Sequence, residues 1–208
     1  MNCDKVEIKA VKFRKDGFYT QPFVFGGEEG QDKFDKNIRY RGSLQNYLID
    51  TGSEVILVDT GLPAGTPEEV PNEDSPIFTG KDICSYMDAF KALGYRPEQV
   101  TKILVTHRHS DHTGELKSFP NAKIYVNQEE MDAAELQGLT NLVPVSYTDG
   151  AYYNFPESQK IQDGIYLIKP RATPREIASS WWRWTACSTC FTATSPTLTK
   201  LSTRTNCR

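Results

Sequence analysis

The sequence lacks the features that mark membrane, secreted and nucleotide-binding proteins. Among its 208 residues, no apolar run approaches the ~18 residues of a membrane span, and no apolar stretch follows the first residues as in a signal peptide. Five Cys at irregular spacings do not form a disulfide framework, so we expect free thiols and a cytoplasmic protein. There is also no Walker A loop, no G-x-S-x-G turn and no GxGxxG segment.

The sequence also lacks a large excess of charge of either sign, because it contains 24 Lys and Arg and 27 Asp and Glu. Without a basic stripe we expect no binding to nucleic acid. The balance hides a break: residues 170–208 hold six basic residues and one acid, net +5, which leaves −8 for residues 1–169. The same segment holds all three Trp, three of the five Cys and nine Thr. We therefore predict a domain over residues 1–169 and an off-pattern tail over 170–208.

Strand and helix patterns alternate along residues 1–169, which indicates an α/β class. Expected strands span residues 6–13, 44–50, 55–59, 103–106, 124–126 and 161–168. Expected helices span residues 82–93 and 128–136. Residues 14–42 and 64–80, rich in Gly, Pro and charge, are expected to be exposed loops.

All three His of the chain lie within six residues, directly after the expected strand 103–106. Side chains alternate in extended chain, so His107 and His109 point to the same side and can bind one ion. Asp111 and His112 follow where the chain turns, and can face a neighbouring ion. Nitrogen and carboxylate ligands suit Zn²⁺, with Mn²⁺, Fe²⁺ or Co²⁺ as alternatives.

A metal at this place indicates hydrolysis. Bound water then has a pKa of about 7, and the ion polarises a substrate oxygen. Asp111 is both a ligand and the catalytic group that orients the hydroxide. We expect a small-molecule substrate with a reactive carbonyl.

These residues resemble a known family. The segment from His107 to His112 looks like the H-x-H-x-D-H signature of the metallo-β-lactamase superfamily, and Val58-Asp59-Thr60-Gly61 resembles its V-D-x-G strand end. Within the superfamily, the segment 58–63, the acidic loop after it and the segment 103–107 are most similar to the N-acyl homoserine lactonase-like branch. The resemblance implies an αββα sandwich with two metal ions, one on His107 and His109, the other on Asp111 and His112. It also implies that Asp59 holds the His loop by hydrogen bonds.

The chain departs from the family pattern after residue 169. The family supplies three more ligands downstream, a His, a bridging Asp and a second His, whereas this chain has no His after 112 and no Asp after 163. We therefore expect the sandwich to be incomplete at the C-terminus. The alternative to a hydrolase is a catalytically impaired member of the family that binds metal weakly.

A shift of the reading frame explains the departure. If the codons for residues 170–176 are read one nucleotide out of register, they permit the family's P-G-H-x-P-G segment. Its histidine then stands in place of Thr173. The alternative is a divergent tail, disordered or specialised for interaction. Under the shift hypothesis, the Cys187-x-x-Cys190 pair carries no metal or redox function.

Overall fold

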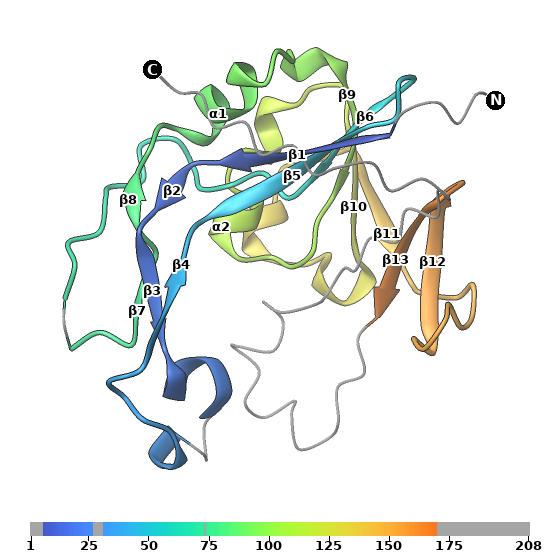
Figure 1. Ribbon diagram of the computed structural model, residues 1–208. Coiled ribbons are helices and arrows are strands. Elements are labelled where there is room, and N and C mark those ends of the chain that lie inside the picture. Colours follow the sequence, from blue (N-terminus) through green and yellow to red (C-terminus); the bar gives the residue numbers. More distant parts are fainter. Residues whose placement is uncertain (1–5, 27–30, 73, 170–208) are drawn as a thin grey trace.

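The computed structural model describes residues 6–26, 31–72 and 74–169, and a six-stranded sheet lies at their centre (Figure 1). The strand order is β1-β5-β6-β9-β10-β11. The bounds of these strands are β1 Glu7–Lys12, β5 Gln45–Asp50, β6 Val55–Val58, β9 Val100–Leu104, β10 Lys123–Asn127 and β11 Leu142–Val145. β1, β5 and β6 pair antiparallel, whereas β6, β9, β10 and β11 run parallel. The carboxyl ends of the parallel strands therefore meet at one edge of the sheet.

The sheet is buried on both faces, as the uninterrupted apolar run of β6 requires. All four residues of β6 are buried. Leu57 points into a cluster with Phe90 of α1, Tyr86–Ala92, and Ile56 points into a second cluster with Leu167 of β13, Ile165–Lys169. The predicted α/β class is thus confirmed, with one layer of packing on each side of the sheet.

The helix α1, Tyr86–Ala92, covers the first face and is shorter than the predicted 82–93. It begins late because Lys81–Asp82 form the short strand β8 and because Ser85 caps the helix. The Ser85 hydroxyl accepts a hydrogen bond from the backbone amide of Asp88 at 3.1 Å.

The prediction of an exposed loop over residues 14–42 was wrong. This segment contains strands β2 Arg14–Lys15, β3 Gly17–Thr20 and β4 Arg39–Gly42, a π-helical turn η1 Pro22–Gly26 and a 3-10 turn η2 Gln31–Lys33. β3 lies between β4 and β7, Ile77–Phe78, so a strand also interrupts the predicted loop 64–80. We call β3, β4, β7 and η1 the arm; it extends from the central sheet in Figure 1. Its pairings join segments far apart in sequence, so no local pattern revealed them.

A buried arginine of β2 fixes the segment between residues 67 and 82. Arg14 is 2% exposed, and its guanidinium contacts Asp82 at 2.7 Å, Thr79 at 2.7 Å and the carbonyl of Pro67 at 3.0 Å. Three acceptors satisfy the buried charge and fix the segment 67–82 against β2. An otherwise irregular segment is therefore held beside β2.

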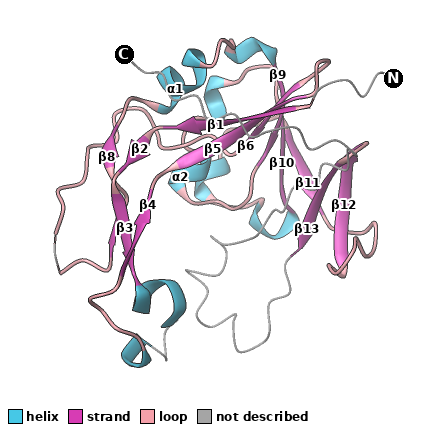
Figure 2. Ribbon diagram, in the orientation of Figure 1, coloured by secondary structure: helices cyan, strands magenta, loops and turns pink. Residues whose placement is uncertain are grey.

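In place of the single strand predicted over residues 161–168, the structure has a hairpin. Its strands are β12, Glu157–Gln162, and β13, Ile165–Lys169. It packs on the second face of the central sheet and begins a second β layer there (Figure 2). The predicted helix 128–136 was also wrong in type, because two 3-10 turns, η5 Gln128–Glu130 and η6 Ala134–Leu136, take its place. The remaining elements are η3 Pro97–Gln99, α2 Ser110–Thr113 and η4 Leu116–Ser118.

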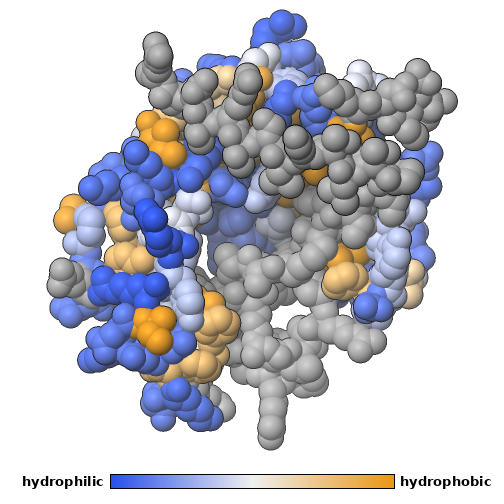
Figure 3. Space-filling view, viewed as in Figure 1, coloured by the Kyte–Doolittle hydropathy of each residue, from blue (hydrophilic) through white to orange (hydrophobic). Residues whose placement is uncertain are grey.

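Among the described residues that are visible in Figure 3, most are hydrophilic, and hydrophobic residues lie over the arm. Exposed apolar side chains of the arm and its neighbours include Val24, Phe25, Ile38 and Tyr40. Among the described helices, none has the length and apolar character needed to cross a membrane. The predicted tail, residues 170–208, lies outside the described residues.

Candidate metal centre

The cluster of His residues lies at the edge where the parallel strands end, with His107 and His109 in the loop after β9 and His112 in the short helix α2. The backbone amide of Val105 donates to the carbonyl of Tyr125 at 2.9 Å, so β10 guides the chain just past the end of β9. The chain then turns, and His109 precedes the four-residue helix α2. His107 is 2% exposed, which places its imidazole inside the protein rather than on the surface.

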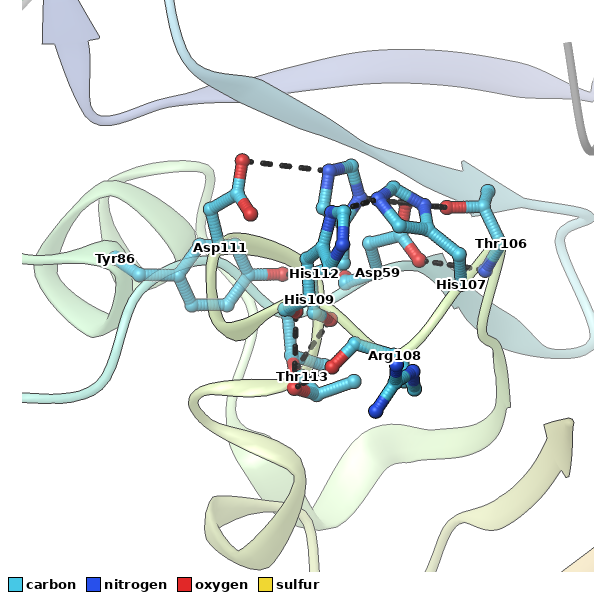
Figure 4. Close-up of polar contacts among 10 residues, drawn as sticks. Asp59, Tyr86, Thr106, His107, Arg108, His109, Asp111, His112 and Thr113 are labelled. Atoms are coloured by element: carbon cyan, nitrogen blue, oxygen red, sulfur yellow. Dashed lines mark hydrogen bonds and ion pairs between the residues drawn. The ribbon is translucent and has the colours of Figure 1, made fainter. Parts of the chain in front are cut away.

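The four predicted ligands form two pairs (Figure 4). Nε2 of His107 lies 3.0 Å from Nδ1 of His109, and Nε2 of His112 lies 3.4 Å from Oδ2 of Asp111. The rings of His107 and His112 lie 4.0 Å apart between centroids, so the two pairs are adjacent. The structure thus brings together all four side chains that the sequence singled out.

Asp59 lies beneath this loop, in a backbone conformation with φ of 62°. Its Oδ1 accepts from the amide of Thr106 at 2.8 Å, and its Oδ2 accepts from the Thr106 hydroxyl at 2.8 Å. Oδ2 also lies 2.7 Å from Nδ1 of His112. A left-handed conformation at a non-Gly residue is a local strain that the surrounding contacts must maintain. It turns the carboxylate at the end of β6 toward the loop after β9.

The two loops also dock through their backbones. The amide of Thr60 donates to the carbonyl of His112 at 2.7 Å, and the amide of Gly114 donates to the carbonyl of Gly61 at 2.8 Å. A Cβ on Gly114 would lie 2.2 Å from the backbone nitrogen of Pro63, so only Gly permits this approach. The hydroxyl of Tyr86, from α1, donates to the carbonyl of Asp59 at 3.1 Å.

Burial and neighbouring charge separate the pKa values of two adjacent imidazoles. Burial, with the nearby charges of His112 and His109, lowers the pKa of His107 to about 3. Burial also acts to lower the pKa of His112, but the carboxylates of Asp59 and Asp111 outweigh it and raise that pKa to about 10. Burial acts to raise the pKa of Asp111, yet its contacts with His112 lower it overall. His107 is therefore neutral at pH 7, the form in which an imidazole binds a metal.

The donor pairs fit divalent metal ions in type and spacing. Two ligand atoms at roughly 2.0–2.1 Å from one tetrahedral ion are about 3.4 Å apart, close to the separations within each pair. Within the part of the chain that the structure describes, no group of three or more His, Cys, Asp or Glu side chains is arranged to hold an ion. The described residues thus offer two ligands at each position rather than a closed site.

Sequence reasoning missed three residues that shape the loop. The hydroxyl of Thr106 lies 3.0 Å from Nδ1 of His107 besides contacting Asp59. The hydroxyl of Thr113 donates to the carbonyl of His109 at 3.0 Å, and Tyr86 supports the Asp59 backbone. The first two flank the His segment in sequence, which was a signal available beforehand, whereas Tyr86 offered none.

The fold and the paired donors define a class of protein with a metal-binding loop at the edge of an α/β sheet. Residues 41–161 match the family described as the metallo-beta-lactamase superfamily, and the chain belongs to this family. It is 33% identical to an N-acyl homoserine lactonase from Bacillus sp. over 97 residues, which are 43% of this chain and 38% of that protein. The chain is also 33% identical to the N-acyl homoserine lactonase of Bacillus cereus over 100 residues, with the same coverage of both chains. Each match therefore spans less than two fifths of the relative's length.

Solved structures show the same fold. An N-acyl homoserine lactone hydrolase with the product N-hexanoyl-L-homoserine bound at its catalytic metal centre superimposes with a TM-score of 0.56 at 21% identity. The superposition covers 81% of this chain and 66% of that one. A second structure, of a quorum-quenching N-acyl homoserine lactone hydrolase, superimposes with a TM-score of 0.57 at 21% identity. This superposition covers 81% of this chain and 64% of the other. The predicted metallo-β-lactamase fold is therefore confirmed, and the similarity to N-acyl homoserine lactonases over part of the chain agrees with the resemblance noted in the sequence.

Proposed function

We propose that this protein is a metal-dependent hydrolase of lactones, esters or thioesters. His107 and His109 are the ligands of one divalent cation, and Asp111 and His112 are ligands of a second. Zn²⁺ is the first choice of metal, with Mn²⁺, Fe²⁺ or Co²⁺ as alternatives. The observation that carries the proposal is the spacing within the two donor pairs, together with their fixation by Asp59. We further propose that residues 1–169 act as one domain.

The described residues prepare the site in two ways. Asp59 accepts from Nδ1 of His112, which leaves Nε2 of that ring on the side of Asp111. The low pKa of His107 keeps its ring unprotonated at neutral pH. A bound divalent cation supplies a Lewis acid that polarises a carbonyl and makes water a nucleophile near pH 7.

A small-molecule substrate agrees with a related structure, which holds the product N-hexanoyl-L-homoserine at its catalytic metal centre. The charge of −8 over residues 1–169 disfavours a nucleic-acid substrate by repulsion. We therefore place acyl lactones first and thioesters second among the substrates to be tried.

The second candidate is a catalytically impaired member of the family. It is favoured by the absence, within the described ranges, of any third ligand converging on either donor pair. An ion held by two protein ligands exchanges readily, and affinity falls accordingly.

Metal analysis of the purified chain, followed by a panel of lactones and thioesters, distinguishes the two candidates. About two ions per chain and turnover that a chelator abolishes support the hydrolase. Less than one ion per chain without turnover supports the impaired member.

Asp111→Ala then tests the assigned role within an active chain. We expect hydrolysis to be lost while the chain stays folded, because the Asp111 side chain is 28% exposed rather than part of the core. Asp163→Ala is the matched control, since that carboxylate is 87% exposed and pairs only with Lys160 among the described contacts. Full turnover in Asp111→Ala contradicts the assignment.

A further inference from the structure

A cavity lies where the chain passes between the central sheet and the arm. Its volume is about 460 Å³, and its lining consists of Lys12, Lys15, Asp16, Arg41, Gly42 and Ser43. That volume is within the range of small-molecule sites in proteins. None of the lining residues belongs to the candidate metal centre, so the proposed function leaves this cavity unexplained.

An irregularity in strand pairing produces the cavity. Residues 13–16 face only residues 43–44, between the last pair of β1 with β5 and the first pair of β3 with β4. Four residues face two, so the longer segment bulges out of the ladder. The amide of Phe13 donates to the carbonyl of Leu44 at 3.1 Å, and Asp16 ends the bulge with a left-handed φ of 58°. Backbone contacts therefore fix the shape of the lining.

The lining is positively charged, although residues 1–169 as a whole carry −8. Lys12, Lys15 and Arg41 face a single carboxylate, that of Asp16, which gives three positive charges against one negative and a net charge of +2. Neither lysine has an acidic partner among the described residues. The positive potential of the cavity is therefore local, and only one acid opposes it.

A second lysine adds to this potential from the neighbouring strand. Lys15 of β2 is directly opposite Lys81 of β8 in an antiparallel pair, and both side chains are exposed. Directly opposite residues project from the same face, where like charges destabilise a sheet. A local rule broken at a cost in stability is expected at functional sites. A bound anion between these strands would relieve the repulsion.

The one carboxylate of the lining is weakly held. Nη2 of Arg41 lies 3.4 Å from Oδ1 of Asp16, whereas a strong charge-assisted hydrogen bond is about 2.7–2.9 Å long. The Arg41 side chain is 91% exposed and that of Asp16 is 52% exposed. Ion pairs so open to water contribute little. An incoming anion can therefore replace Asp16 as the partner of Arg41.

We propose that this cavity binds the phosphate group of a small organic phosphate monoester. Lys12, Lys15 and Arg41 supply the charge, and Ser43 adds a hydroxyl donor to the lining. Arg and Lys are the side chains that proteins use to bind phosphate. A net charge of +2 matches the nearly dianionic phosphate monoester at pH 7 better than it matches a carboxylate, which has one charge. The inference does not rest on the proposed function.

Titration of the metal-free chain with phenyl phosphate tests the proposal. A chelator is present throughout, because phosphate also binds divalent metal ions. The readout is the ¹H–¹⁵N NMR spectrum at constant ionic strength, in which the amides of Gly42 and Ser43 report on the cavity. We expect saturable shifts with a dissociation constant on the order of 1 mM. Benzoate, which carries a carboxylate on the same ring, should bind about 10-fold more weakly.

Two substitutions should change the affinity in opposite directions. Lys15→Gln should raise the dissociation constant about 10-fold, because it removes a cation from the lining. Asp16→Asn should lower it at least ~3-fold, because it releases Arg41 and removes the opposing charge. Asn tolerates the left-handed backbone at this position.

Lys123→Gln is the matched control, because it makes the same change of charge at an exposed lysine. β5 is antiparallel to β6, so β5 begins at the edge of the sheet where β6, β9 and β10 end. The cavity lies at that edge, whereas Lys123 begins β10 at the opposite edge. The control should leave the dissociation constant within about twofold of the parent value, because salt screens distant charges.

Shifts that stay proportional to the phenyl phosphate concentration overturn the proposal, because they indicate screening without a site. Benzoate that binds as tightly as phenyl phosphate overturns it as well. So does a loss of affinity in Lys15→Gln no larger than in Lys123→Gln, or weaker binding in Asp16→Asn than in the parent chain. All of these measurements are made without metal, so their failure leaves the proposed hydrolase standing, and a chain without hydrolase activity leaves the phosphate site standing.

Discussion

Oδ2 of Asp59 lies 2.7 Å from Nδ1 of His112, although 53 residues separate them along the chain. A carboxylate can only accept, so the hydrogen lies on Nδ1 of the imidazole and the lone pair of its neutral form lies on Nε2. Nε2 is the atom that lies 3.4 Å from Asp111. The contact at the end of β6 thus determines which nitrogen of His112 is available to a metal.

Asp59→Asn should reverse this tautomer. Asn tolerates the left-handed backbone at this position, and its amide N–H can face Nδ1 of His112, which then becomes an acceptor. We expect the hydrogen to move to Nε2 and Zn²⁺ affinity to fall about 10–100-fold. Long-range ¹⁵N–¹H NMR of the imidazole, recorded in metal-free protein above the His112 pKa of about 10 where the ring is neutral, and a Zn²⁺ titration measure the two effects.

Asp88→Asn is the control for that substitution. Asp88 lies in α1 and contacts Ser85 at 2.7 Å, away from the His loop. Its replacement should leave the His112 tautomer and Zn²⁺ affinity unchanged. A hydrogen that stays on Nδ1 in Asp59→Asn, with unaltered affinity, shows that another group sets the tautomer.

Gly114→Ala should destabilise the contact between the two loops. The new Cβ would lie 2.2 Å from the Pro63 nitrogen and 2.4 Å from the Leu62 carbonyl carbon, and both atoms are backbone. We expect the free energy of unfolding to fall by roughly 1–3 kcal/mol, as for other overpacked sites. Urea denaturation measures the change.

Gly52→Ala provides the comparison. Nothing lies within 4 Å of a Cβ there, and only the φ of 80° opposes the substitution. It should cost about 1 kcal/mol. If Gly114→Ala is no more harmful than Gly52→Ala, the close approach of the two loops is not a constraint on the fold.

Tyr95→Phe should lower stability in a pH-dependent way. The Tyr95 hydroxyl donates to Oδ2 of Asp50 at 2.7 Å and accepts from Lys9 Nζ at 2.7 Å. The bond to Tyr95 is the main reason that the pKa of Asp50 is lowered from 3.8. A depressed carboxyl pKa contributes stability above the unfolded value, and this is lost as pH falls through the folded pKa.

We therefore expect Tyr95→Phe to cost about 1 kcal/mol at pH 6 and to approach the parent chain in stability as pH falls below 3.8. Thermal unfolding between pH 3 and pH 7 measures how this difference in stability changes with pH. The range includes the pKa of a free Asp side chain, about 3.9. Tyr47→Phe, which removes an exposed contact with Gln45, is the control. A difference that does not change with pH rules out Asp50 as its source.

The reading-frame hypothesis for residues 170–208 makes a prediction about the gene. DNA sequencing around codon 169 should show an open frame in the other register, with a histidine codon in place of that for Thr173. Stop codons in that register would instead establish the tail as a divergent sequence. Repair of the frame should then raise metal content, because it adds the downstream ligands.

Strong local patterns predicted the elements that form the central sheet. The apolar runs at 55–59 and 103–106 became β6 and the end of β9, because a strand buried on both faces must be apolar throughout. The prediction of a helix over residues 128–136 was wrong, because these residues form the capped turn η5 and the separate turn η6. The arm was missed because β3 is defined by its pairing with β4 and β7, not by its own sequence.

The sequence by itself determined which groups are available for chemistry: two imidazoles two residues apart, then a carboxylate and a third imidazole, after an apolar strand. Spacing sufficed because side-chain alternation is local. The tertiary structure alone decided how these groups are held. Asp59 reaches the loop from the end of β6 because neighbouring parallel strands end at one edge of a sheet, a proximity that arises only when distant segments pair.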